Sequence, residues 1–446
     1  MKSEETEVVK QPNEKNKSIA PADKYIWAIY IMLCIISIIE QYSASARVVS
    51  STNIFGPLIR HCGHLLLCFG VICIVQKIPY TKFIKWIPVL AIGSVLFAIY
   101  VMLWGDVING ARRSVKVLGL MSLQPAEFIK FSAAALLALI LSKSQLKDGK
   151  GVSNRGFYAA IIVTGILAAV LIKQGTTNTL ILCAISYSMM IFGGVQAKRL
   201  LIMLFAAVAL IGGVITYGLI KYNKKYDENG KLRTEVVMSA SEQIAKGETV
   251  DRLTDVFIPR LIRWWNGDER KWEQEINRYN HQEQYSYIAQ ANGGLFGVFP
   301  GNSREAARLP LAFSDYIFAI VIEDIGLLGG MFLLVLYLFL MARASGIASQ
   351  CKRAFPMLLV MGMALYITFQ ALFHMGIVSG LFPVSGQPLP LISAGGSSIL
   401  VTSIALGVML SVSRFAIRKK NNDRKEEKEE ISALPEDARA DNPSLL

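Results

Sequence analysis

The feature that most constrains this chain is a series of long apolar runs. A helix needs about 20 apolar residues to cross a bilayer, and most of the runs approach that length. The 446 residues are 53% hydrophobic and only 18% charged, with a mean hydropathy of +0.43, a composition that excludes an ordinary soluble domain. We therefore predict an all-α polytopic membrane protein with about ten transmembrane helices, at residues 25–43, 58–76, 83–104, 126–142, 157–172, 178–194, 199–220, 315–342, 355–381 and 395–416.

These runs divide the chain into five segments. The tail at the C-terminal end is densely charged with few apolar residues, a composition typical of disorder. The N-terminal tail lacks the cleavage pattern of a secretory signal, so the first span is expected to remain as an anchor. We predict a cytoplasmic tail at 1–24, seven helices at 25–220, one large extracytoplasmic loop at 221–314, three helices at 315–416 and a disordered cytoplasmic tail at 417–446.

The positions of lysine and arginine predict the orientation. Among the short loops, those after the second, fourth, sixth and eighth runs carry most of the Lys and Arg, and short loops rich in these residues usually face the cytoplasm. Both termini are therefore predicted to be cytoplasmic. The net charge of +13 is spread over these loops and the tails, which favours contact with anionic lipid headgroups rather than nucleic acid.

Asp315 lies where the Gly-rich stretch 293–330 passes from a polar loop into an apolar run. A carboxylate at a membrane boundary is costly and usually faces a cavity or a partner. The alternative is a helix N-terminus, because Ser314 and Asp315 are good capping residues, and the residues alone leave both interpretations open. Asn302 and Ser303 lie in the same stretch, whose glycines permit close backbone approach, and are candidate substrate contacts.

A second polar feature is the loop at 105–125, which carries cations on the predicted outer side. Lys and Arg are usually found in cytoplasmic loops, so their presence on the outer side needs an explanation. Ligand binding is one explanation, and a few charges tolerated in a loop is the alternative. Arginine forks and lysine ammonium groups suit phosphate oxygens. Arg112, Arg113 and Lys116 are therefore candidates for binding a phosphorylated lipid headgroup, with Gln124 beside them at the start of the fourth span.

Glu127 and Lys130 are three residues apart near the start of the fourth span, so they share one face of the expected helix. Inside a membrane such a pair is either a structural clasp or part of a polar cavity. We expect a structural ion pair.

Residues 380–398 contain three prolines and four glycines, which is incompatible with a regular helix. Irregular backbone at membrane depth persists only where it is buried in protein or lines a watery cavity. We therefore predict a polar cavity on the outer side. The candidate residues lining it are Pro390, Ser393, Gly395, Gly396 and Ser397.

Four motifs together resemble the shape, elongation, division and sporulation (SEDS) family, which includes FtsW and RodA. They are NGARRSV at 109–115, QPAEFIK at 124–130, the Gly-rich stretch 293–330 and PVSGQPLPLISAGGSS at 383–398. The resemblance implies a ten-span glycosyltransferase of the bacterial inner membrane that polymerises lipid II into peptidoglycan strands. The NGARR form and the cytoplasmic tails favour the division branch over the elongation branch.

The resemblance also implies roles for individual residues. The family's proposed catalytic aspartate falls on Asp315 and its buried ion pair on Glu127 and Lys130. Phe313 and Ser314 stand where the family commonly has His-Thr, which leaves Asp315 more isolated as the candidate base.

The implied reaction is attack of a sugar hydroxyl on the anomeric carbon of a polyprenyl-pyrophosphate sugar. A carboxylate base typically contributes about 10²–10⁴-fold to such a step, and cations can stabilise the leaving pyrophosphate. The resemblance allows a divalent cation, Mg²⁺ or Mn²⁺, as cofactor and predicts no organic cofactor. The implied partners are a class B penicillin-binding protein acting as transpeptidase, divisome or elongasome proteins, lipid II and the membrane.

Two other functions fit part of the pattern. Broken helices and buried charge pairs also occur in transporters, which predicts a lipid II flippase. A non-catalytic scaffold of a cell-wall synthesis complex is the other alternative.

Overall fold

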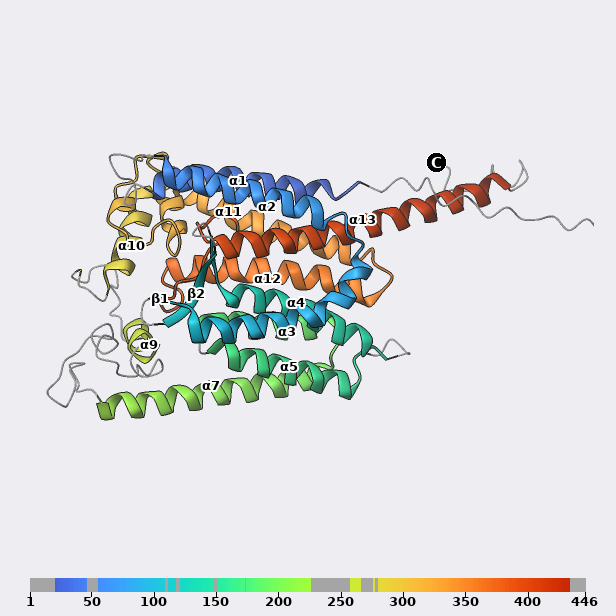
Figure 1. The fold of residues 1–446 in the computed structure, drawn as a ribbon, viewed down its shortest axis with the longest axis horizontal. Helices are drawn as coiled ribbons and strands as arrows, with labels where there is room; N and C mark the ends of the chain where they lie inside the picture. The colour runs from blue at the N-terminus through green and yellow to red at the C-terminus, as the bar shows by residue number, and fades with distance from the viewer. Residues whose placement is uncertain are drawn as a thin grey trace, which may run out of the picture.

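The computed structural model describes residues 21–45, 55–108, 111–117, 121–146, 151–172, 174–225, 257–265, 276 and 280–433. Within these ranges the long helices run side by side in one elongated bundle (Figure 1). This arrangement confirms the predicted all-α polytopic fold. The helices are α1 (Lys24–Ala44), α2 (Gly56–Val75), α3 (Tyr80–Trp104), α4 (Pro125–Lys143), α5 (Asn154–Ile172), α6 (Thr176–Phe192), α7 (Ala197–Lys225), α11 (Ile317–Ala348), α12 (Ala354–Val378) and α13 (Gly396–Ala433).

Nine of the helices in the described ranges are long and apolar enough to cross a membrane, and α6 is shorter, at 17 residues. At 1.5 Å per residue α6 is about 25 Å long, less than the hydrocarbon core of about 30 Å. The predicted ten spans thus correspond to nine helices of spanning length and one short helix.

The start of α1 and the far end of α13 lie at the same end of the bundle (Figure 1). Asp23, which caps α1 through its side chain, pairs with Arg343 of α11 at 2.5 Å, and its backbone N donates to Ser413 Oγ of α13 at 3.2 Å. The chain therefore enters and leaves the bundle on one side, as the distribution of lysine and arginine predicts.

The charged C-terminal region differs from the prediction. α13 continues to Ala433 and projects beyond the other helices (Figure 1), although disorder was predicted from residue 417 onward. Its glutamates and lysines are good helix formers, and opposite charges three or four positions apart stabilise a helix. Residues 1–20 and 434–446 of the predicted tails lie outside the described residues, as do residues 226–256 of the predicted large loop.

Three short strands between α3 and α4 are a second difference. β1 (Asp106–Ile108), β2 (Ala111–Val117) and β3 (Met121–Leu123) form one antiparallel sheet in the order β1-β2-β3. The loop predicted at 105–125 is therefore a β-meander at the end of the bundle that also carries α9 (Ile258–Trp265) and α10 (His281–Gly293) (Figure 1). β1 and β3 have only three residues each, which is too short to produce a clear alternating pattern of apolar and polar residues.

The Gly-rich loop after α10 docks onto a break in α11. Gly326 has φ 74° and interrupts the helix, and Leu327 N then donates to Gly294 O at 2.9 Å. A Cβ on Gly326 would lie 2.3 Å from Leu295 O, so only glycine permits this approach. Backbone contacts of this kind hold the loop that leads to Asp315.

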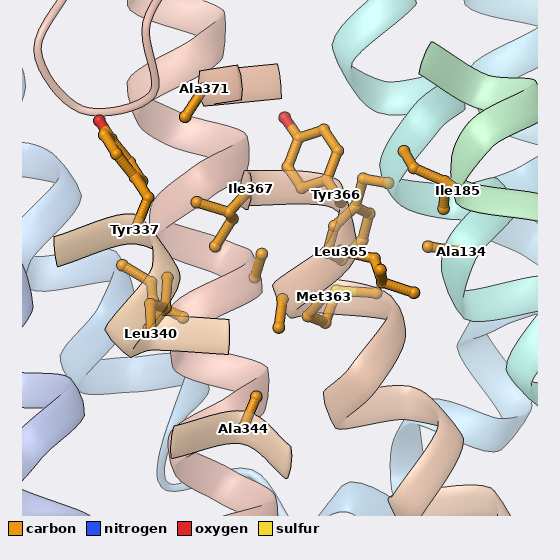
Figure 2. Close-up of a cluster of buried hydrophobic side chains, with 14 of the residues drawn as sticks. Ala134, Ile185, Tyr337, Leu340, Ala344, Met363, Leu365, Tyr366, Ile367 and Ala371 are labelled. Carbon is orange, nitrogen blue, oxygen red and sulfur yellow. The ribbon is translucent and has the colours of Figure 1, made fainter. Parts of the chain in front are cut away.

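α12 is the centre of the bundle. In an 18-residue apolar stretch of α12, 83% of the residues are buried, compared with 6% in the corresponding stretch of α7. Figure 2 shows Met363 and Ile367 of α12 between Leu340 of α11 and Ala134 of α4. Close packing of this kind makes α12 a rigid support for α4 and for the irregular segment that follows it.

Candidate active site

Asp315 lies on the turn that precedes α11 and is half-buried. Its backbone N donates to Leu311 O at 2.9 Å, and Ser314 Oγ donates to its carboxylate Oδ1 at 2.8 Å. The N-cap residue of α11 is Tyr316, one position later. Capping by Asp315, the alternative left open by the sequence, is therefore wrong.

The Pro-Gly-Ser loop, residues 383–398, packs directly against this turn. Ala394 N donates to Phe313 O at 2.9 Å, and Ser393 Oγ donates to Ser314 O at 2.6 Å. At Gly386 the loop comes so close that a Cβ would lie 2.4 Å from Asp315 Oδ2. The structure thus brings Asp315 and this loop together on one side of the bundle.

Gly386→Ala provides a test of this contact. The added methyl group would displace the Asp315 carboxylate, and a displacement of about 1 Å can cost about 10²-fold in rate. We expect a loss of that order in glycan polymerisation, measured as the initial rate, with an unchanged thermal unfolding midpoint. Gly346→Ala, in α11 and outside the candidate site, is the matched control, because a Cβ there has nothing within 4 Å. Equal rates for the two variants would contradict the contact.

Arg260 of α9 supplies a cation to this region. Its Nη1 donates to Val384 O of the Pro-Gly-Ser loop at 3.1 Å, and its charge interacts with the carboxylates of Glu283 and Asp315. Burial lowers the pKa of the Arg260 guanidinium, Arg263 acts in the same direction, and Tyr316, Glu283 and Asp315 oppose them. Arginine stays charged under these conditions.

Sequence analysis did not identify Arg260. The mixture of arginines and tryptophans in 258–265 is typical of a segment at a membrane interface, and it gives no sign of contact with a loop more than a hundred residues away. The only sequence feature that could have indicated Arg260 is weak: it is a cation beside apolar residues within a polar segment.

Tyr316 is a second group beside Asp315. It is buried, and its Oη has no hydrogen-bond partner among the described residues. Burial raises the pKa of Tyr316 above its usual 10, and Glu283 and Asp315 raise it further. The phenol therefore stays protonated at neutral pH.

The basic residues of the meander are only partly described. Arg112 and Arg113 belong to β2, but their side chains lie outside the described part of the structure. Lys116 is exposed. β3 contacts the end of the Pro-Gly-Ser loop, because a Cβ on Gly396 would lie 2.3 Å from Met121 Cγ. The meander therefore borders the same loop as Asp315.

The predicted ion pair forms within α4. Lys130 Nζ lies 2.8 Å from Glu127 Oε1, with the two side chains 0% and 1% exposed. Tyr366 Oη donates to Glu127 Oε2 at 2.7 Å, and Lys130 Nζ donates to Gln370 Oε1 at 3.0 Å. Gln370 Nε2 in turn donates to Pro388 O at 3.2 Å, so the ion pair is linked through α12 to the Pro-Gly-Ser loop.

Two candidate substrate contacts, Asn302 and Ser303, also have hydrogen-bond partners within the protein, and their contact with substrate stays a prediction. Ser303 Oγ donates to the buried carboxylate of Glu323, and Asn302 Nδ2 donates to Val298 O at 3.0 Å. Both residues hold the Gly-rich loop together. The sequence placed them correctly in this loop but could not show that Glu323, twenty residues away, faces them.

The remaining candidates support the Pro-Gly-Ser loop. Pro390 O accepts from Tyr337 Oη at 2.6 Å, and Ser393 Oγ accepts from Leu389 N at 2.7 Å. Ser397 is buried, and Gln124 is the N-cap residue of α4. The contacts of Pro390 and Ser393 shape the loop, and Gly395 remains partly exposed within it.

Comparison with known proteins defines the family. The FTSW_RODA_SPOVE cell cycle protein family matches residues 23–247 and 252–418. The chain belongs to this family. The stage V sporulation protein E of Bacillus subtilis is 30% identical over 403 residues, covering 88% of this chain and 97% of that protein. A probable peptidoglycan glycosyltransferase FtsW of Enterococcus hirae is 28% identical over 414 residues, covering 91% and 95%.

Solved structures share the fold. One belongs to a study of how a peptidoglycan synthase complex coordinates polymerization and crosslinking; it matches with a TM-score of 0.66 at 20% identity, covering 89% of this chain and 98% of that one. The rod shape determining protein RodA of Thermus thermophilus matches with a TM-score of 0.58 at 20% identity, covering 88% and 97%. The family's membrane fold therefore extends over nearly the whole chain.

Proposed function

We propose that this chain is a peptidoglycan glycosyltransferase that polymerises lipid II at the outer face of the bacterial inner membrane. The observation that carries the proposal is the contact between the Asp315 carboxylate and the Pro-Gly-Ser loop, with Arg260 bound to the same loop. Curated relatives named as probable peptidoglycan glycosyltransferases support it.

In the proposed reaction, the hydroxyl of an acceptor sugar attacks the anomeric carbon of a polyprenyl-pyrophosphate sugar. Asp315 takes the hydroxyl proton as the new carbon–oxygen bond forms, while the bond to the pyrophosphate breaks. The hydrogen bond from Ser314 to Oδ1 orients the carboxylate. Arg260, together with Arg112, Arg113 and Lys116 of the meander, would stabilise the negative charge that gathers on the leaving pyrophosphate.

A divalent cation remains a prediction of the sequence. The described residues contain no group of three or more His, Cys, Asp or Glu side chains placed to hold a metal ion. Mg²⁺ or Mn²⁺ therefore stays a prediction, and the proposed reaction uses protein side chains alone. A divalent ion that arrived with the pyrophosphate, as is common for Mg²⁺, would be held by Asp315 and would supply positive charge to the leaving group.

The orientation and the partner belong to the same proposal. Both termini would be cytoplasmic, which places Asp315 and the strands at the outer face. A class B penicillin-binding protein would cross-link the new strands, and divisome or elongasome proteins would recruit the pair. The fold shared with a chain of a peptidoglycan synthase complex supports this expectation.

The experiment tests one preparation for two activities, strand formation and movement of lipid II between leaflets. The purified chain, with its transpeptidase partner, is given fluorescent lipid II in detergent, and the products are separated by size before and after muramidase digestion. We expect a muramidase-sensitive ladder of strands. In sealed vesicles, movement of lipid II between leaflets without strand formation would identify a flippase, and neither activity would identify a scaffold.

A further inference from the structure

The Gly-rich loop, residues 294–304, joins α10 to the 3₁₀ helix η4 (Glu305–Ala307) and presents large apolar side chains on its outside. Leu295 is 51% exposed, Phe296 73% and Phe299 72%. Phe299 also has φ 71°, a backbone conformation that is strained for a bulky residue. Exposed apolar groups of this size commonly mark contact with a membrane or a partner.

The backbone of the loop is paired with the break in α11. Val298 N donates to Glu323 O at 2.9 Å. Phe299 N donates to Asp324 O at 2.8 Å. Helix carbonyls that the break leaves without a helical partner therefore bind amides of the loop. Irregular backbone persists at membrane depth only where its polar groups are satisfied within the protein, and these amides meet that condition.

Two helices give the depth of the loop in the membrane. Asp23 and Arg343 form an ion pair at the end of the bundle opposite α10 (Figure 1). The pair lies at or beyond one edge of the hydrocarbon core, because charges favour headgroups over hydrocarbon. Leu327 is sixteen residues from Arg343 along α11, which is about 24 Å of helix. Tyr42 is nineteen residues from Asp23 along α1, about 28 Å.

Both ends of these lengths that lie away from the ion pair contact the loop. Leu327 N donates to Gly294 O, and a Cβ on Gly301 would lie 3.4 Å from the ring of Tyr42. Neither length exceeds the hydrocarbon core, which is about 30 Å thick. The loop therefore lies at the other edge of the core or just inside it.

The loop continues the exposed apolar side of α11. Leu327 and Leu328, whose amides bind the loop, are each 48% exposed, and Met331 is 53% exposed. Because α11 is long and apolar enough to cross a membrane, these side chains face the bilayer. Leu295 and Phe296 extend the same apolar surface past the break in the helix. Continuity with a membrane-facing surface favours lipid as the occupant.

We propose that the Gly-rich loop is inserted into the bilayer at the Asp315 end of the bundle and binds lipid acyl chains through Leu295, Phe296 and Phe299. Tyr42, 54% exposed beside the loop, supplies the amphipathic ring that is typical of the membrane–water boundary. The lipid contact anchors the segment that leads to Asp315, and it is independent of the proposed reaction.

Photocrosslinking tests the contact. Phe296 is replaced by its photoreactive analogue benzoylphenylalanine in the full chain, which is placed without a partner in nanodiscs of phosphatidylcholine and phosphatidylglycerol and irradiated. Mass spectrometry measures the fraction of chain that gains the mass of a lipid. Burial of one aromatic ring favours the inserted loop by at least about tenfold, so the lipid adduct should exceed that of a water-facing position by a similar factor.

Two positions are the matched controls. Ala307 is exposed between Arg304 and Arg308, whose charges favour water over hydrocarbon, and benzoylphenylalanine there should give the lower yield. Leu338, in the middle of the membrane-facing side of α11 and 46% exposed, should give a lipid yield similar to that at Phe296.

A second measurement uses the unmodified chain, so it does not depend on the folding of a variant. Hydroxyl radicals oxidise apolar side chains that contact water, and Phe296 is mostly exposed in the protein alone. Lipid should slow its oxidation in nanodiscs by at least about tenfold relative to the unfolded chain. The inference is overturned if Phe296 is oxidised equally fast in both states, if its lipid adduct is no larger than that at Ala307, or if it crosslinks only to a second chain.

Discussion

Replacing Lys130 by methionine is expected to lower the free energy of unfolding by about 3–5 kcal/mol, the usual cost of breaking a buried ion pair from one side. The change leaves the Glu127 carboxylate buried, with a hydrogen bond from the Tyr366 hydroxyl but no counter-charge. It also removes the donor to Gln370, which hydrogen-bonds to the Pro-Gly-Ser loop. Equilibrium unfolding in mixed micelles measures the loss.

A second variant shows whether the orphaned charge is the cause. Adding Glu127→Gln to Lys130→Met removes the uncompensated carboxylate and should recover most of the lost stability. Lys143→Met, an exposed lysine on the same helix, should change stability by no more than about 0.5 kcal/mol. If Lys130→Met were as stable as Lys143→Met, the ion pair would not hold α4 to α12.

Much of the fold could be predicted because the bilayer imposes a length on each helix. The apolar run at 355–381 corresponds to α12, and the prolines and glycines after it correctly predicted irregular backbone. The strands around Arg112 could not be predicted, because pairing between short segments depends on tertiary contacts. The helix through 417–433 was missed because dense charge is common to both disorder and exposed helices.

The candidate site was predictable where polar residues interrupt apolar runs. Asp315 and the Pro-Gly-Ser loop both interrupt such runs, and the structure brings them into contact. Arg260 and Glu283 lie in a polar segment where charges are ordinary, so nothing local marks them. The hydrogen bond from Ser303 to Glu323 could not be predicted, because the two residues are close only in the folded chain.

Asp315→Asn is expected to lower glycan polymerisation by about 10²–10⁴-fold, the usual contribution of a positioned general base. Asparagine keeps the shape of the side chain and can still accept a hydrogen bond from Ser314, but its amide cannot take the proton of the attacking hydroxyl. Because Asp315 is not the N-cap of α11, the unfolding midpoint should stay close to that of the wild type.

The initial rate of strand formation from purified lipid II, by Asp315→Asn and wild type at equal amounts of folded protein with the same transpeptidase partner, tests the central claim most directly. The assignment of Asp315 as the base predicts a rate at least about 10²-fold below the wild type, with partner binding retained. A rate within a few-fold of the wild type would contradict it.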